Sequence, residues 1–148
     1  GKPFTARPTK LKAYYKYTTA PIDNLPSEKN APLDYKRFVS YKGKPDTCAI
    51  YIALGDWDSP VGVYTKYSER KLFDKNDSHV IAYAEFNTGK TVSEYQKLEL
   101  ELEYRAVNRE PKYLLVVCSA SKYGDYFTGG EGATLWVDDF SLEYDYDD

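Results

Sequence analysis

The sequence contains no methionine, a single histidine and only two cysteines among its 148 residues. A Ser-His or Cys-His hydrolase would depend on the lone His79, and no neighbouring residue is placed to orient that ring. Cys48 and Cys118 lack the CxxC spacing of a zinc site, so they are either buried thiols or the two ends of a disulfide. Because methionine is absent even at the first position, Gly1, we expect the chain to be cut from a longer precursor.

Long apolar runs and basic clusters are missing too. No stretch approaches the roughly 20 apolar residues that cross a bilayer, and the N-terminus lacks the pattern of a signal peptide, so we expect no direct membrane insertion. The net charge is −3 and the basic residues are scattered, which argues against a nucleic-acid partner.

Aromatic residues, by contrast, are abundant. Sixteen tyrosines, six phenylalanines and two tryptophans make up 16% of the chain, and aromatic-rich sequences with many short apolar runs favour strands. The length suits one domain with one core, so we expect residues 1–148 to form a single unit.

Alternation with a period of two recurs along the chain, and no stretch has convincing helical periodicity. It predicts an all-β, antiparallel β-sandwich with jelly-roll connectivity. Across the turn 108–111, the fourth and fifth strands are expected to form a hairpin. The basic outer face of the first strand should meet an acidic face, either that of the fourth strand or that of the last. The expected strands are 10–17, 47–54, 79–86, 97–107, 112–119 and 135–144.

Aromatic side chains in loops beside carboxylates are typical of sugar-binding sites, because a flat ring stacks on the C–H face of a pyranose. Trp57 lies between Asp56 and Asp58, and Tyr123 and Tyr126 lie in a glycine-rich stretch. These five residues are the predicted carbohydrate-binding set. The alternative is that the rings only cap the ends of the sandwich.

The same loops also offer acids for glycoside hydrolysis, which needs two carboxylates at a defined separation. Asp56 with Asp58, or Asp125 with Glu131, are the candidate pairs. The sequence does not decide whether the protein is an enzyme, although binding without catalysis is the leading hypothesis.

In the last predicted strand, the apolar phase slips by one residue across Asp138 and Asp139, which predicts a β-bulge. The two aspartates could contribute to a structural calcium site or could bond to nearby backbone amides. Upstream of this strand, Gly129 and Gly130 are expected to adopt positive φ and turn the chain.

Three stretches carry a resemblance to a known family: "GKPFTARPTKLKAYYKY", "DTCAIYIAL" and "SKYGDYFTGGEGATLWVDDFSLEY". The chain resembles the putative carbohydrate metabolism domain of bacterial surface lipoproteins. The resemblance implies a jelly-roll sandwich that forms the C-terminal module of an exported protein and handles glycans. It also implies a location at the cell surface or in the periplasm, with the anchor in a part of the precursor outside this chain.

The pattern "YQKLELELEYR" followed by "WVDDFSL" is also similar to carbohydrate-binding modules of this fold. That similarity implies a structural calcium held by Asp138 or Asp139, and no other cofactor is expected. The expected partners are a polysaccharide or oligosaccharide and the N-terminal domain of the precursor. A purely structural or adhesive module is the remaining alternative, and it predicts an apolar patch around Tyr14 or Trp136.

Overall fold

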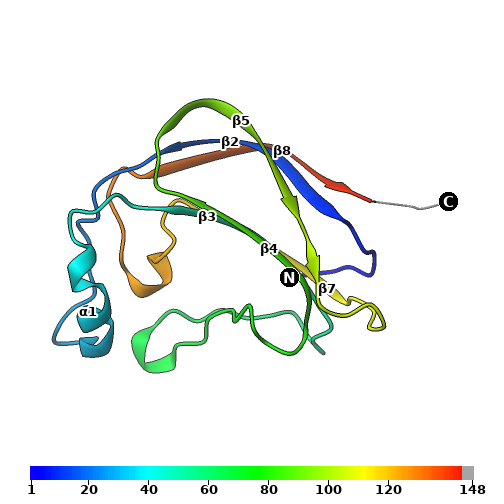
Figure 1. The fold of residues 1–148 in the computed structure, drawn as a ribbon. Coiled ribbons are helices and arrows are strands. Elements are labelled where there is room, and N and C mark those ends of the chain that lie inside the picture. Colours follow the sequence, from blue (N-terminus) through cyan, green and yellow to red (C-terminus); the bar gives the residue numbers. More distant parts are fainter. Residues whose placement is uncertain (145–148) are drawn as a thin grey trace.

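Two antiparallel sheets face each other in the structure, a computed structural model that describes residues 1–144 (Figure 1). The larger sheet has five strands in the order β1 (Lys2–Pro3), β7 (Tyr113–Ser119), β3 (Cys48–Gly55), β4 (Val80–Thr88) and β6 (Glu103–Tyr104). The smaller has three, β5 (Val92–Glu101), β2 (Lys10–Thr18) and β8 (Thr134–Glu143). The predicted all-β antiparallel sandwich is therefore confirmed.

The core lies between the two sheets and follows from the alternation in the strands. On β2, Leu11, Ala13, Tyr15 and Tyr17 are buried, while the residues between them face outward. They pack against the inner row of β3, where Ile50 is fully buried. Burial of one row from each strand is what fixes the register, because a slip of one residue would expose the whole row.

Helical structure occurs where none was expected. Helix α1 spans Pro32–Phe38, and three single turns of 3-10 helix follow elsewhere, η1 (Val39–Tyr41), η2 (Tyr67–Glu69) and η3 (Gly124–Tyr126). Proline suits the first position of a helix because its missing N–H would have no partner there. At seven residues α1 is too short to show a periodic pattern, and its packing through the buried Phe38 must supply most of its stability.

The expected hairpin between segments 97–107 and 112–119 is wrong. Strand β5 pairs with β2 in the smaller sheet, and the chain then crosses to the larger sheet, where β6 pairs with β4. Strand β7 pairs with β3 and β1 instead. The alternation runs unbroken through the crossing because Leu102, at the step between the sheets, is buried like its neighbours in the row.

The outer face of β2 contacts both acidic faces at once, because β2 is the central strand of its sheet. The ammonium group of Lys12 lies 3.0 Å from a carboxylate oxygen of Glu143 on β8 and 3.9 Å from one of Glu99 on β5. From the sequence, the acidic faces of these two strands were alternative partners, and in the structure Lys12 contacts both.

The two cysteines are free thiols, so the disulfide alternative does not apply. Cys48 is buried as expected, but Cys118 is exposed. It lies on β7 beyond the two residues that pair with β1, on the side of the sandwich where an open apolar groove separates β7 from β8. An inward position in the alternation therefore did not ensure burial.

A third layer covers the larger sheet. Residues 56–79, which connect β3 to β4, cross its outer face below the sandwich in the view of Figure 1. Within residues 1–144, none of the helices has the length and apolar character needed to cross a membrane.

Candidate functional site

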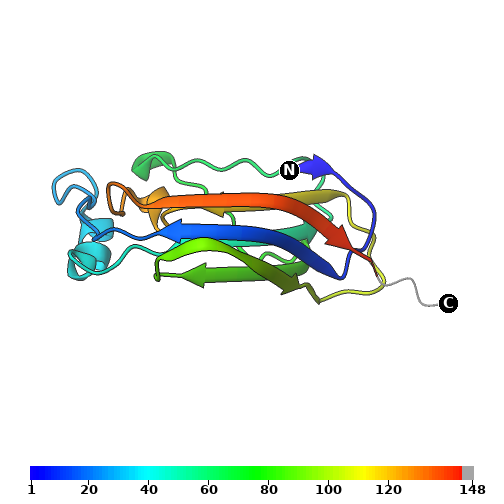
Figure 2. The ribbon, with the colours of Figure 1, turned by 90° about the horizontal axis from the view of Figure 1, so that it is seen from above.

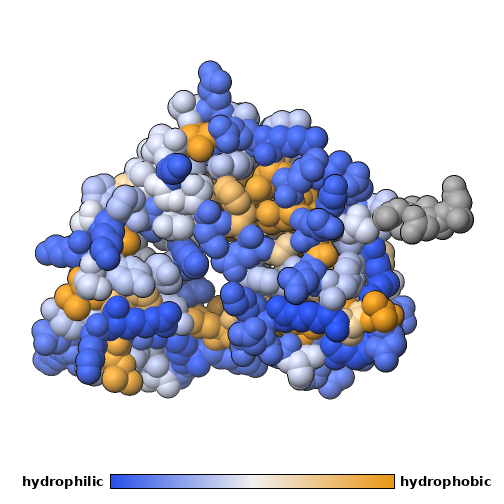
Figure 3. Space-filling view, viewed as in Figure 1, coloured by the Kyte–Doolittle hydropathy of each residue, from blue (hydrophilic) through white to orange (hydrophobic). Residues whose placement is uncertain are grey.

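A cleft of about 710 Å³ lies between the outer face of the larger sheet and the segment 56–79, with the end of α1 and the loop around η3 closing one side. Figure 3 shows the molecule hollowed between the sandwich and the segment below it. Ligand-binding pockets commonly have volumes of about 300–1,000 Å³, so the cleft has room for a small oligomeric ligand.

The floor of the cleft is the outward row of the central strands. Tyr51 on β3 lies directly opposite Glu85 on β4 and opposite Val117 on β7. Tyr83 lies opposite Ala53 on the neighbouring strand β3. These residues alternate with core residues of the same strands, so the core positions them rigidly.

Three aromatic rings are stacked at one end of the cleft. Phe73, from the segment 56–79, lies 5.4 Å from the Tyr51 ring and 6.2 Å from the Tyr83 ring, with interplanar angles of 18° and 19°. Partial burial, followed by the nearby charges of Asp125 and Glu85, raises the pKa of Tyr51 to about 12. Its hydroxyl therefore stays protonated at neutral pH and can donate a hydrogen bond.

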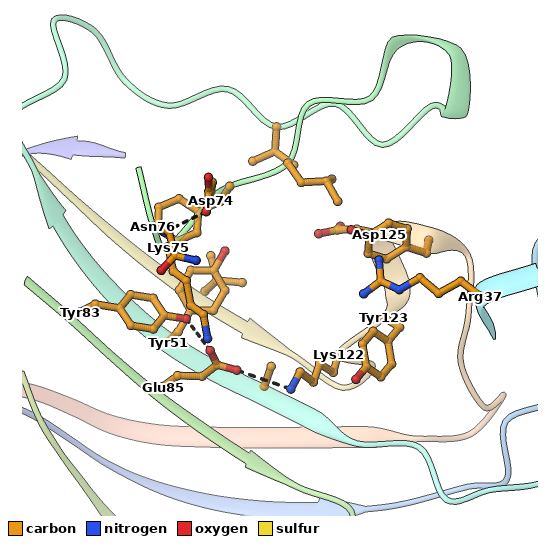
Figure 4. Close-up of a pocket in the computed structure, with 16 residues that line it drawn as sticks. Arg37, Tyr51, Asp74, Lys75, Asn76, Tyr83, Glu85, Lys122, Tyr123 and Asp125 are labelled. Carbon is orange, nitrogen blue, oxygen red and sulfur yellow. Dashed lines mark hydrogen bonds and ion pairs between the residues drawn. The ribbon is translucent and has the colours of Figure 1, made fainter. Parts of the chain in front are cut away.

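Glu85 is the carboxylate at the centre of the floor (Figure 4). The Tyr83 hydroxyl donates to one carboxylate oxygen at 2.5 Å, and the Asn87 amide donates to the other at 2.6 Å. The ammonium group of Lys122 lies 3.9 Å away. Burial alone would raise the pKa of Glu85, but these two hydrogen bonds and the positive charge outweigh it and hold the pKa below its usual value.

The wall opposite the ring stack combines cations, tyrosines and one further acid. Arg37, at the end of α1, and Lys122, Tyr123 and Asp125, around η3, face Tyr83 and Glu85 across the cleft (Figure 4). The fully buried ring of Phe38 fixes this wall, since it lies 5.1 Å from Tyr123. Tyr126, 5.0 Å from Phe38, completes the wall, and the Arg37 guanidinium lies 4.9 Å from its centroid.

Asp46 anchors the loop that carries this wall. Its carboxylate is almost fully buried and accepts hydrogen bonds from the Thr47 amide at 2.8 Å, the Ser121 hydroxyl at 2.5 Å and the Gly130 amide at 2.9 Å. Ser121 and Gly130 are the two ends of the loop. One carboxylate therefore closes the loop that places Tyr123 in the cleft.

The glycines of this loop act differently from what was expected. Positive φ occurs at Phe127 (54°) and Gly132 (92°), and not at Gly129 or Gly130. At Gly130 a Cβ atom would lie 2.6 Å from the carbonyl oxygen of Pro21, so that position is glycine because two backbone segments approach closely.

Trp57 does not line the main cleft. Its indole ring lies on Gly55, where a Cβ atom would be 2.1 Å from the ring, and its N–H donates to Asp77 at 3.3 Å. The ring also makes an edge contact with Phe73, at 6.3 Å between centroids. Trp57 thus supports the segment that covers the cleft, and it borders a smaller pocket of about 300 Å³ that shares Phe73 with the cleft.

The other predicted sugar-binding residues are divided between the two places. Tyr123 and Tyr126 line the cleft. Asp56 forms an ion pair with Arg109 at 3.3 Å outside it, and Asp58 is fully exposed at the rim of the smaller pocket. The structure therefore brings the two tyrosines together and leaves the group around Trp57 on the far side of Phe73.

Several cleft residues were not among the predicted ones. Glu85 and Tyr51 were interpreted only as parts of strands, and Arg37 lies in the unexpected helix. A signal was present in the sequence: Glu85 is the one charged residue among Val80–Phe86 of an otherwise apolar strand. A carboxylate in such a position needs hydrogen-bond partners, which marks it for structural or functional use.

The predicted bulge at Asp138 and Asp139 is confirmed. Lys12 pairs with Ser141 and Tyr14 with Asp138, so two residues of β8 oppose the single residue Ala13. Asp139 adopts φ of 54°, and its amide donates to the Asp138 carboxylate at 2.8 Å. Asp138 thus accepts a hydrogen bond from a backbone amide, which is the arrangement expected from the sequence as the alternative to a calcium site.

Calcium takes about six to eight oxygen ligands, and two adjacent aspartates supply too few. Within residues 1–144, no group of three or more histidines, cysteines, aspartates or glutamates gathers in a way that could hold a metal ion. The calcium hypothesis stays a prediction.

The fold and the cleft define a class: an all-β sandwich domain with a cleft on one sheet that is lined by aromatic rings and carboxylates. The chain belongs to the family described as "Putative carbohydrate metabolism domain", which matches residues 1–143. The expected family is thereby confirmed, and with it a role related to carbohydrates.

Two solved structures share the fold. One is a crystal structure of a putative glycoside hydrolase from Bacteroides thetaiotaomicron VPI-5482, with a TM-score of 0.68 and 23% identity. The other is a putative glycoside hydrolase from Bacteroides vulgatus ATCC 8482, with a TM-score of 0.64 and 24% identity. The match covers 99% and 97% of this chain but only 41% and 54% of theirs. No curated protein matches the chain in sequence.

Proposed function

We propose that the cleft on the larger sheet binds a carbohydrate. The observation that carries the proposal is the position of Glu85, an ionised acceptor at the floor between the ring stack around Phe73 and the tyrosine wall. Sugars are recognised by aromatic faces that stack on their C–H surface and by polar groups that bond their hydroxyls. The cleft provides both, and the family that matches the chain is described as "Putative carbohydrate metabolism domain".

The polar groups of the cleft suit hydroxyl recognition. The ionised Glu85 accepts hydrogen bonds, Lys122 and Arg37 donate them, and the protonated Tyr51 hydroxyl can donate as well. Charge-assisted hydrogen bonds of this kind are about twice as strong as neutral ones, so the carboxylate should dominate affinity.

Replacing Glu85 with glutamine is expected to weaken glycan binding about tenfold or more, because the substitution removes the charge while keeping the shape. Binding would be measured by glycan array and then by calorimetry with the best ligand. The matched control is Glu94→Gln, an exposed glutamate on β5 of the other sheet, which should bind as the unaltered protein does. Equal affinity of Glu85→Gln and the unaltered protein would remove the cleft as the binding site.

Hydrolysis is the second candidate function, because Glu85 and Asp125 line the same cleft and both similar structures are described as putative glycoside hydrolases. The lowered pKa of Glu85 suits a base or nucleophile, which leaves the acid role to Asp125. In this case, Asp125→Asn should lose at least about 100-fold in reducing-end release while retaining most of the binding. If the protein releases no new reducing ends from any glycan that it binds, hydrolysis is excluded and binding remains as the proposed function.

A further inference from the structure

A second set of aromatic side chains lies on the opposite side of the sandwich, on the outer face of the smaller sheet. Tyr14 on β2, Tyr95 on β5 and Trp136 on β8 are 41%, 46% and 40% exposed. The three strands lie side by side, with β2 in the centre (Figure 2). We call these three rings the outer patch. The cleft lies beyond the other sheet, so the two surfaces are separate.

Lys16 lies within the outer patch, between two of its rings. Its ammonium group is 4.9 Å from the centroid of Tyr95 and 4.8 Å from that of Trp136. Lys16 pairs directly with Trp136 across the strands, and Tyr14, two residues earlier on β2, points from the same face. The cation is therefore held at the centre of the patch by contacts with ring faces.

The charge of Lys16 differs from that of the other lysines on this face. Lys10 and Lys12 each form an ion pair with Glu143, and Lys97 forms one with Glu99 at 3.0 Å. Among residues 1–144, Lys16 forms no ion pair, because no carboxylate oxygen lies within 4.0 Å of its ammonium group. The aromatic part of the face thus presents a lysine without such an ion pair, whereas Lys10, Lys12 and Lys97 are each paired with a glutamate.

We propose that the outer patch binds an acidic polysaccharide, with uronic acid rings stacked on the exposed aromatic side chains and a sugar carboxylate paired with Lys16. Tyr95 and Trp136 are two strand spacings apart, about 10 Å, so one extended chain can meet both rings. The pairing of a carboxylate with Lys16 is a charge-assisted contact beside two stacking surfaces.

A polysaccharide fits this face better than a folded protein does. The ion pairs of Lys12 and Lys97 adjoin the patch, and the cores of protein interfaces are depleted of such charges because burial would strip their water. A sugar chain lying across the patch leaves those ion pairs hydrated. The inference goes beyond the proposed function, since it assigns a separate surface and a specific ligand chemistry.

The test is affinity electrophoresis and calorimetry of the full chain with polygalacturonate, a polymer of a uronic acid, and with its methyl-esterified form. The unaltered protein should bind the acid form, and binding should weaken about tenfold with the ester or in Lys16→Ala. Trp136→Ala and Tyr95→Ala should each weaken binding of the acid form as well. Tyr95 is the more exposed ring, so its variant remains informative if Trp136→Ala folds poorly.

A matched control separates this proposal from a general loss of positive charge. Lys10→Ala removes a neutralised lysine from the same face and should change affinity less than twofold. Equal binding of acid and ester, or unchanged binding in both Lys16→Ala and Tyr95→Ala, would overturn the proposal. A dimer in sedimentation that Tyr95→Ala converts to a monomer would also overturn it, because the face would then be a contact between copies.

Discussion

Replacing Asp46 with alanine is expected to lower the free energy of unfolding by about 3–5 kcal/mol. The substitution removes three hydrogen bonds to a buried carboxylate and leaves the Ser121 hydroxyl and the Gly130 amide without their acceptor. Hydrogen bonds to charged groups contribute about 1.5–3 kcal/mol each, and recovered hydration of the unfolded carboxylate offsets part of the sum. Urea denaturation followed by tryptophan fluorescence would measure the change.

The same variant should bind glycan in the cleft more weakly even at a temperature where it is folded, because its loop carries Tyr123 and Tyr126. The matched control is Asp23→Ala. Asp23 also accepts a hydrogen bond from the neighbouring backbone, at Glu131, but it is exposed and should cost less than about 1 kcal/mol. A loss below that size in Asp46→Ala would show that the loop is held by its aromatic contacts and not by the carboxylate.

The strands could be predicted from sequence because each buries one row of side chains or two. The segment 10–17 shows this most simply, with alternate residues buried beside a basic outer row. The bulge at Asp138 and Asp139 was predictable for the same reason, since an extra residue shifts the phase of the pattern. Alternation therefore predicted both the strands and their main irregularity.

Strand pairing was less predictable because alternation indicates a buried face and not a neighbour. The row through Leu98, Leu100 and Leu102 continues without a break, although the chain changes sheets at its end. Short elements could not be predicted from the sequence for a related reason. Helix α1 has seven residues, and the long-range contacts of Phe38 with the loop around Tyr123 stabilise it rather than a local pattern.

The cleft was predictable only where its residues lie in a loop. Tyr123 and Tyr126 stood out because they lie in a glycine-rich loop, and both line the cleft. Glu85 did not stand out, because its place in the cleft depends on segments distant in sequence, which supply Phe73 and Lys122. Trp57 stood out by its polar neighbours, yet Gly55 provides the surface on which it packs.

Replacing Asp34 with alanine should have the second large effect, about 3 kcal/mol of lost stability. Asp34 is a buried residue in the first turn of α1, and its carboxylate lies 2.5 Å from the guanidinium of Arg70 in the segment 56–79. Both side chains are at most 15% exposed, so removal of the acid leaves a cation in a site with little water. The pair forms an ionic link between the helix and the segment that covers the cleft.

The guanidinium of Arg70 also donates to the carbonyl of Thr65 and lies 4.7 Å from the Tyr126 ring. The ion pair therefore orients a residue that contacts both the covering segment and the tyrosine wall. Without Asp34, the segment should separate from α1 more readily, and Phe73 would leave the ring stack. We expect faster hydrogen exchange in residues 56–79 and weaker glycan binding in the cleft, with binding at the outer patch unchanged.

A double-mutant cycle with Arg70→Ala separates the pair from other effects of Asp34. A carboxylate in the first turn also interacts favourably with the helix dipole, by about 0.3–1 kcal/mol, and that part persists when Arg70 is absent. The coupling energy between the two sites should be about 1–3 kcal/mol. Asp58→Ala, which removes a fully exposed carboxylate 4.0 Å from Lys112, is the control and should leave the stability almost unchanged. A coupling energy near zero would mean that ring contacts, and not the ion pair, hold the covering segment against the helix.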